Sequence, residues 1–403
     1  MKLLKYELKK LFSSKGILLL IAILLAANAV LCFLSPSKTA DHQSDEKYIA
    51  GYQNDIRRVI RLAELNIADL SGGGDGYIID YQKKVIEKYS ALINAGQTPE
   101  SVIGYNEYIL FSGQITLLLV LAVVIGSAVA LCEKDAGMKP FLGISKKGRS
   151  VYGVKLLSLL FLSITLTAID SLTGIILCGI RYGFSGVFAP LVSVQSLELC
   201  PYPIHIIEYI GILFVMGVFL TFTLSVLSAL VGKLSGSYLL TFLCGGAVCA
   251  GLYISDFDIN NYFIRYRAVN MFGMAVDAFP VALIALLFIC AVLCTIFCFL
   301  GNKQTTLGDK LHRAELMLLC SIHSIFKRFT KIRKPRRAKR HGLYLYELKK
   351  VLISSKLILL VILLLGAKLY IGIGDISRDD LYEKEYYRLC AELSGELTDE
   401  KSA

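Results

Sequence analysis

The stretch Tyr6-Glu7-Leu8-Lys9-Lys10-Leu11-Phe12 near the start of the chain returns near its end as Tyr346-Glu347-Leu348-Lys349-Lys350-Val351-Leu352. Each copy leads into an apolar run, 17–34 after the first copy and 357–373 after the second. Because the same core and the same continuation occur twice, the chain contains an internal repeat.

Each copy carries lysines on one helical face and Tyr and Leu side chains on the other. A basic amphipathic segment of this kind lies in the membrane interface and turns into the span that follows, like an elbow. We therefore predict an elbow helix at 1–16 and a second elbow with its span at 343–373. The elbow residues are Tyr6, Glu7, Leu8, Lys9, Tyr346, Glu347, Leu348 and Lys349. The alternative for one copy alone is an ordinary basic flank before a span.

The composition is typical of an all-α, polytopic helical membrane protein. Of the 403 residues 55% are hydrophobic, and the mean hydropathy is +0.60. The net charge of +11 falls almost wholly in segments that would share one side of a membrane, which indicates the positive-inside rule and not nucleic-acid binding. Most of the eleven cysteines lie in or beside apolar runs, so we expect no disulfide framework and no metal site.

The apolar runs predict seven membrane spans, with the N-terminus in the cytoplasm of a multi-pass cell-membrane protein. These spans are 17–34, 113–132, 154–180, 207–231, 237–254, 280–300 and 357–373. On this count the loop 133–153, inside the block 113–300 that holds spans two to six, is cytoplasmic. Its basic residues and Lys233 then lie inside, while few basic residues lie in the loops that fall outside.

The polar segment 35–112 is too charged for lipid and is predicted to be an external domain. Apolar residues recur there at helical spacing on both sides of the glycine run 72–76, which predicts an αα-hairpin with a glycine turn. The apolar positions at this spacing are Ile49, Tyr52, Ile56, Val59, Ile60 and Ala63, then Ile78, Tyr81, Val85, Ile86, Tyr89, Leu92 and Ile93. The glycine run lacks the neighbours of a phosphate-binding or calcium loop.

The segment 301–342 is predicted to be a basic cytoplasmic linker that lies partly on anionic lipid. After the second elbow and span, the polar segment 374–403 corresponds to the start of the first external domain. The repeat therefore predicts that the chain is truncated inside a second unit.

The loop between the second and third spans reads Glu133-Lys134-Asp135-Ala136-Gly137-Met138-Lys139-Pro140-Phe141-Leu142-Gly143-Ile144-Ser145-Lys146-Lys147-Gly148-Arg149. This loop resembles the cytoplasmic loop of type 2 ATP-binding cassette transporter permeases, especially those of Gram-positive bacteria. The elbow, the external helical domain and the six spans per unit extend the resemblance. The resemblance covers essentially the whole chain through motifs that are individually degenerate.

The resemblance implies that this loop is a coupling helix that docks on a separate ATPase subunit. The implied coupling residues are Glu133, Gly137, Phe141, Leu142, Ser145, Gly148 and Arg149. Such docking needs an apolar contact, here Phe141 and Leu142, with charged residues around it. The alternative is that this segment is an ordinary solvated basic loop. No Walker A string occurs in the chain, so the permease is not itself an enzyme, and ATP would bind to the partner. A second permease unit is a further expected partner.

Asp170 is the one conspicuous charge within the predicted spans. An ionised carboxylate there is costly, so it should face the bundle interior or a wet cavity. It either lines a translocation path or is neutral and hydrogen-bonded to Ser163, Thr167 or Thr173 on its own helix.

Two rival functions remain open besides a permease. A secondary carrier with parallel repeats would use intramembrane acids and bases, which are nearly absent. A membrane sensor or scaffold would use the external domain to bind a ligand and would need no ATPase. The sequence predicts neither the substrate nor a catalytic constellation.

Overall fold

The computed structural model describes residues 22, 26, 42–70, 76–105, 108–109, 116–135, 148–254 and 259–301. The chain divides into two compact units, Met1–Arg328 and Phe329–Ala403, and every described residue belongs to the first. Several predicted segments lie outside the described residues, apart from residues 22, 26 and 301. They are the two elbows, the spans 17–34 and 357–373, the linker 301–342 and the segment 374–403.

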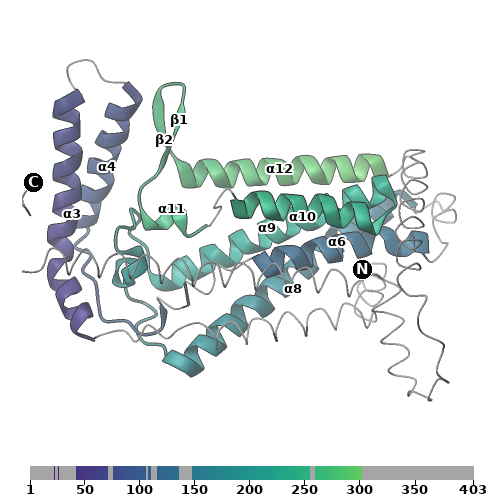
Figure 1. The fold of residues 1–403 in the computed structure, drawn as a ribbon, viewed down its shortest axis with the longest axis horizontal. Helices are drawn as coiled ribbons and strands as arrows, with labels where there is room; N and C mark the ends of the chain where they lie inside the picture. Colours follow the sequence, from purple (N-terminus) through teal and green to yellow (C-terminus); the bar gives the residue numbers. More distant parts are fainter. Residues whose placement is uncertain are drawn as a thin grey trace, which may run out of the picture. The chain divides into compact units, whose positions relative to one another are not determined.

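The described part of the chain is mostly helical, as predicted (Figure 1). The polar region contains α3 (His42–Leu70) and α4 (Gly76–Asn94). Five apolar helices follow: α6 (Thr116–Asp135), α8 (Gly148–Tyr182), α9 (Ile206–Ser235), α10 (Tyr238–Ile254) and α12 (Ala278–Gly301). Each of the five coincides with one of the predicted spans.

Three of the apolar helices are long and apolar enough to cross a bilayer, judged by length and composition. They comprise Tyr152–Tyr182 of α8, Ile206–Ser235 of α9 and Ala278–Phe299 of α12. The apolar parts of α6 and α10, Leu118–Leu131 and Leu240–Leu252, are shorter. The count of seven spans therefore stays a prediction.

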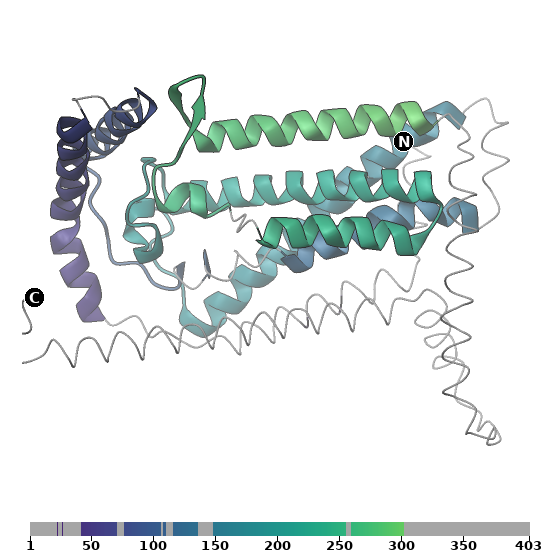
Figure 2. The same ribbon diagram turned by 45° about the horizontal axis from the view of Figure 1, so that its top comes forward.

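Helix α9 is the centre of the bundle, because it packs against α6, α8, α10 and α12 (Figure 2). Two of its buried hydroxyl groups bond within the helix: Thr221 donates to the carbonyl of Gly217 at 2.8 Å, and Ser225 donates to that of Thr221 at 2.7 Å. Back-bonding of this kind lets small polar residues lie in an apolar helix without an unpaired donor. Small side chains then allow neighbouring helices to approach closely.

Helices α6 and α9 approach each other closely at Gly126. A Cβ atom at Gly126 would lie only 2.2 Å from the carbonyl oxygen of Ser225. The obstacle is backbone and not a flexible side chain, so no rotamer change can relieve it. Gly126 is thus the residue that fixes how closely α6 and α9 pack.

Helices α3 and α4 pack against each other on either side of residues 71–75. Of the positions that the helical periodicity predicted, Tyr52, Ile56 and Ala63 on α3 and Val85, Tyr89 and Leu92 on α4 are buried. Others, such as Val59 and Ile86, are partly buried, and Ile78 is 38% exposed. The side of the membrane on which this hairpin lies stays a prediction.

Short irregular segments join the apolar helices at the end of the bundle nearest the α3–α4 hairpin. The turns η1 (Leu191–Ser193) and η2 (Gln195–Leu197) lie between α8 and α9, and α11 (Asn261–Ile264) lies between α10 and α12. Leu191 and Val192 are fully buried, and Phe263 is nearly so. These segments share one hydrophobic core with the α3–α4 hairpin and the start of α9.

The prediction of an all-α fold is wrong for residues 268–277. There β1 (Ala268–Met271) pairs antiparallel with β2 (Met274–Asp277), and Val269 lies opposite Val276. The two turn residues Phe272 and Gly273 have φ values of +56° and +85°. A two-residue turn with both φ angles positive matches the twist of an antiparallel pair, so the strands form despite their short length.

We predict that Gly126→Ala destabilises the bundle by about 1–3 kcal/mol, the usual range for overpacking a tight contact. The matched control is Gly246→Ala on α10, where an added Cβ meets no described atom within 4 Å. Thermal unfolding of fluorescent-protein fusions in detergent, followed by size-exclusion chromatography, measures both variants. Equal melting temperatures for the two variants would show that the α6–α9 approach does not limit packing.

Candidate functional site

One face of α4 binds the segment that contains the β-hairpin. Tyr77 donates a hydrogen bond to the carbonyl of Ala268 at 3.0 Å, and Tyr81 donates to that of Tyr266 at 3.2 Å. The backbone N–H of Ala275 donates to Asp80 at 2.7 Å, and Lys84 donates to the carbonyl of the same alanine. We call this contact, together with Lys88 and Asp277, the α4–β joint.

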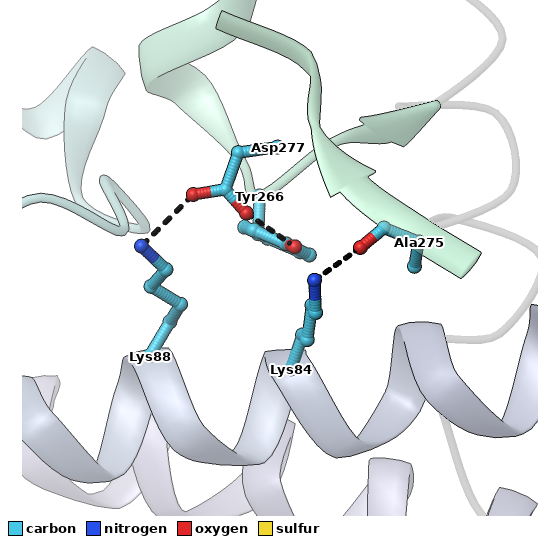
Figure 3. A network of polar contacts seen from close by, with 5 residues as sticks. All are labelled: Lys84, Lys88, Tyr266, Ala275 and Asp277. Carbon is cyan, nitrogen blue, oxygen red and sulfur yellow. Dashed lines mark hydrogen bonds and ion pairs between the residues drawn. The ribbon is translucent and has the colours of Figure 1, made fainter. Parts of the chain in front are cut away.

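The α4 residues of the joint are spaced three or four apart, so they lie on one side of the helix. Lys88 forms an ion pair with Asp277 at 2.9 Å, and Tyr266 donates a hydrogen bond to the same carboxylate at 2.7 Å (Figure 3). The Lys88 ammonium also lies 5.6 Å from the centre of the Tyr202 ring. One lysine therefore connects α4 to β2 and to the segment between α8 and α9.

Charges at the joint stabilise the ionised form of Asp277. Burial raises its pKa, but the hydrogen bonds from Lys88 and Tyr266 and the charges of Lys88 and Lys84 outweigh burial, so the pKa lies below the ordinary 3.8. The pKa of Tyr266 is raised by its burial and by the hydrogen bond that it donates to Asp277. At neutral pH the joint therefore contains the carboxylate of Asp277 and the protonated phenol of Tyr266.

A third tyrosine of α4 extends these contacts into the shared core. Tyr89 donates a hydrogen bond to the carbonyl of Leu199 at 2.8 Å, and burial raises its pKa to about 12. Tyr202, Phe263 and Phe279 pack around one another with ring centres 5.0–6.1 Å apart. Because Phe279 belongs to the first turn of α12, this aromatic group connects the core directly to that helix.

At the opposite end of the bundle, four helices meet beside the ends of the predicted coupling loop. Lys155 of α8 is 2% exposed and donates to the carbonyl of Val129 on α6 at 3.4 Å. Lys233 of α9 lies 3.7 Å from the centre of the Tyr152 ring, and Phe297 of α12 packs edge-on against the same ring at 5.9 Å. We call these five residues the loop end of the bundle.

The position of these two lysines suits their charge. Lys233 lies in the last turn of α9, and Lys155 contacts a carbonyl group near the end of α6. The carboxyl ends of helices carry partial negative charge, which stabilises nearby cations. An aromatic face adds a further attraction for the Lys233 ammonium.

The structure places the ends of the predicted coupling segment but not its middle. Glu133 lies in the last turn of α6, and Gly148 and Arg149 begin α8. The predicted residues Gly137, Phe141, Leu142 and Ser145 lie outside the described residues. The segment between the two helices is 136–147, shorter than the expected 133–153 because both helices extend into it.

Asp170 is partly buried on α8 and lies close enough to Tyr108 for its charge to act on that phenol. Burial raises the pKa of Tyr108, and the negative charge of Asp170 raises it further. Two of the hydroxyl groups proposed as partners of Asp170 have other contacts: Thr167 meets Thr221 of α9 at 3.3 Å, and Thr173 donates to the carbonyl of Ile169 at 2.6 Å. Both interpretations of Asp170 stay open.

Sequence reasoning missed the joint and the loop end. The signal for the joint was the spacing of Tyr77, Lys84 and Lys88 on one face of α4, beside the apolar face that packs against α3. The signal for the loop end was Lys155, one residue inside a predicted span, where its charge needs partners.

No group of three or more potential metal ligands occurs among the residues that the structure describes. No family model, no curated protein and no solved structure matches this chain.

We predict that Lys88 and Asp277 are energetically coupled by about 0.5–1 kcal/mol, since the pair is partly exposed and water screens it. A double-mutant cycle of Lys88→Met and Asp277→Asn, followed by thermal unfolding, measures this coupling. Lys83→Met, at an exposed position on the same helix, is the control. Additive effects of the two changes would contradict the prediction.

The same pair predicts a pH dependence. The pKa of Asp277 is lower in the folded protein than its ordinary value of 3.8. The contribution of the pair is therefore complete above the ordinary value and is lost as the pH falls through the lower, folded-state value. The difference in melting temperature between wild type and Asp277→Asn should be constant at neutral pH and should shrink only under strong acid.

Proposed function

We propose that this chain is the membrane-spanning permease subunit of an ATP-driven exporter. In this proposal an ATPase subunit binds the segment 136–147 with its flanking residues Glu133, Gly148 and Arg149. Substrate then moves by alternating access when ATP binding and hydrolysis change the position of that segment. All seven predicted spans and the external side of the α3–α4 hairpin belong to this proposal.

Three features support a membrane protein of this kind. Three helices have the length and composition of membrane spans, and α9 packs against four apolar neighbours. The segment 136–147 leaves α6 and enters α8 at the loop end, where buried Lys155 connects the two helices. A force applied to this segment would therefore act first on α6 and α8.

The observation that carries the proposal is the set of contacts made by α12. Near one end, Phe297 packs against Tyr152, four residues from the start of α8. At the other end, α12 begins directly after Asp277, whose carboxylate binds Lys88 of α4. The twenty residues between these contacts correspond to about 30 Å of helix at 1.5 Å per residue. Helix α12 thus offers a direct mechanical connection between the two ends of the bundle.

In this mechanism, closure of the ATPase shifts the first turn of α8 and moves the Tyr152 ring against Phe297. Helix α12 tilts as a rigid element and carries β2 and α4 with it. The shared aromatic core at Phe279 keeps the far end of α12 attached to α9 and to the loops. The external hairpin therefore moves in step with ATP hydrolysis.

We predict that Tyr152→Ala preserves membrane insertion and ATPase binding but uncouples ATP hydrolysis from transport, because the contact with Phe297 is lost. The matched control is Tyr238→Ala, which removes an aromatic side chain at the same end that pairs with Phe242 of its own helix. The measurements are co-purification of the ATPase in mild detergent and ATPase rates in vesicles. Normal coupling in Tyr152→Ala would contradict the proposed transmission.

Glu133→Lys and Arg149→Glu should insert normally but abolish stimulation of the ATPase, since a reversed charge at an interface repels its former partner. Lys83→Glu, on the distant helix α4, is the control for a change of charge alone. If both interface variants stimulate the ATPase normally, the coupling segment is wrongly assigned.

The proposed topology predicts which positions an impermeant thiol reagent can reach in intact cells. Single cysteines at Ser71, Ser145 and Lys331, in a background without native cysteines, test it. Ser71→Cys should react, whereas Ser145→Cys and Lys331→Cys should react only after the cells are opened. Reaction at Ser145→Cys in intact cells would overturn the topology.

A membrane sensor is the second candidate, favoured by the firm attachment of the α3–α4 hairpin to α12 through the α4–β joint. It predicts the same external hairpin but no ATPase partner. Co-purification of a protein with a Walker A motif would decide for the permease, and its repeated absence would favour the sensor. A secondary carrier would instead require ion-dependent transport without ATP.

A further inference from the structure

The two faces of the β1–β2 hairpin differ sharply in what they contact. Because side chains alternate along a strand, Ala268, Ala275 and Asp277 lie on one face with Asn270. This face meets α4: the backbone of Ala268 and Ala275 and the carboxylate of Asp277 all bind α4 side chains. The opposite face consists of Val269, Met271, Met274 and Val276 and contains no polar side chain.

Three of the four side chains on this apolar face are exposed, and Val276 is partly buried. Val269 is 41% exposed, Met271 is 40% exposed and Met274 is 60% exposed. Phe272 at the tip is 99% exposed, although its positive φ falls at a turn position that usually holds Asn, Asp or Gly. A row of exposed apolar side chains with an aromatic tip favours an apolar or interfacial surrounding over water.

The position of the hairpin in the chain identifies that surrounding. Asp277, the last residue of β2, is followed directly by Ala278, the first residue of α12 (Figure 1). The apolar surface of α12 continues from there with exposed side chains such as Ile284 and Phe288. Six residues of extended chain separate Ala278 from Phe272 and span at most about 20 Å, so the tip stays near the start of α12.

We propose that the apolar face of the β1–β2 hairpin, with Phe272 at its tip, lies in the lipid interface of the outer leaflet beside α12. This inference rests on the proposed placement of α12 across the bilayer. The exposed residues Arg265 and Arg267 at the base of the hairpin suit contact with phosphate groups of the lipid. The hairpin thus anchors α4, and with it the α3–α4 hairpin, to the membrane surface.

The chain contains no tryptophan, so a single introduced tryptophan reports only on its own surroundings. The test places Phe272→Trp and Met274→Trp separately in the full chain, reconstituted in vesicles of phosphatidylcholine and phosphatidylglycerol. Ile284→Trp on the exposed side of α12 is the control for the bilayer interior. Leu65→Trp, at a 53% exposed apolar position on α3, is the control for water.

We expect Phe272→Trp and Met274→Trp to emit at shorter wavelength than Leu65→Trp. They should also lose most of their fluorescence in vesicles whose lipids carry bromine near the glycerol end of the acyl chains. Ile284→Trp should be quenched by bromine placed deeper, and Leu65→Trp should be quenched by neither lipid.

If Phe272→Trp and Met274→Trp emit like Leu65→Trp and are not quenched, the lipid contact is overturned. If Ile284→Trp is quenched in the same experiment, the proposed function stays intact. Blue-shifted emission of Phe272→Trp and Met274→Trp without quenching would also overturn the lipid contact. The apolar face would then be covered by protein, such as a second permease unit. Absence of quenching at Ile284→Trp would overturn the placement of α12 and the proposed function together.

Discussion

The close approach of α6 to α9 at Gly126 is the constraint on which the bundle depends. In an apolar surrounding, helices gain little from burying apolar side chains, so their association depends on how closely the backbones pack. Gly126 brings the α6 backbone against the carbonyl of Ser225, while the hydroxyl groups of Thr221 and Ser225 bond within α9. With α6 fixed, α9 holds α8, α10 and α12 around it.

The α4–β joint makes the α3–α4 hairpin and α12 depend on each other mechanically. Most of its hydrogen bonds end on backbone carbonyl or N–H groups of the β-hairpin, so the contact depends on the path of the chain more than on particular side chains. The exception is Asp277, where Lys88 and Tyr266 converge on one carboxylate. Joined in this way, the α3–α4 hairpin follows α12 instead of moving freely on a linker.

The sequence predicted the helices well because long apolar runs and a 3.6-residue period are strong, local signals. The inward residues Tyr52, Ile56, Val85 and Tyr89 followed from that period alone, and five predicted spans coincide with described helices. The β-hairpin escaped prediction because each strand has only four residues and the turn uses Phe272 where Asn or Asp would have marked it. The joint and the loop end join residues far apart in the chain, such as Lys88 with Asp277 and Tyr152 with Phe297. Such pairings follow from tertiary packing, which periodicity does not encode.

The burial of Lys155 limits the kind of movement that α8 can make. Its ammonium lies at the carbonyl of Val129, and the helix beyond it is lined with apolar residues. Sliding α8 along its own axis by one turn would carry the charge about 5.4 Å. Displacement toward the apolar middle would leave a cation without its carbonyl partner, which is costly in lipid. The contact of Lys155 with Val129 therefore opposes sliding of α8 along its own axis.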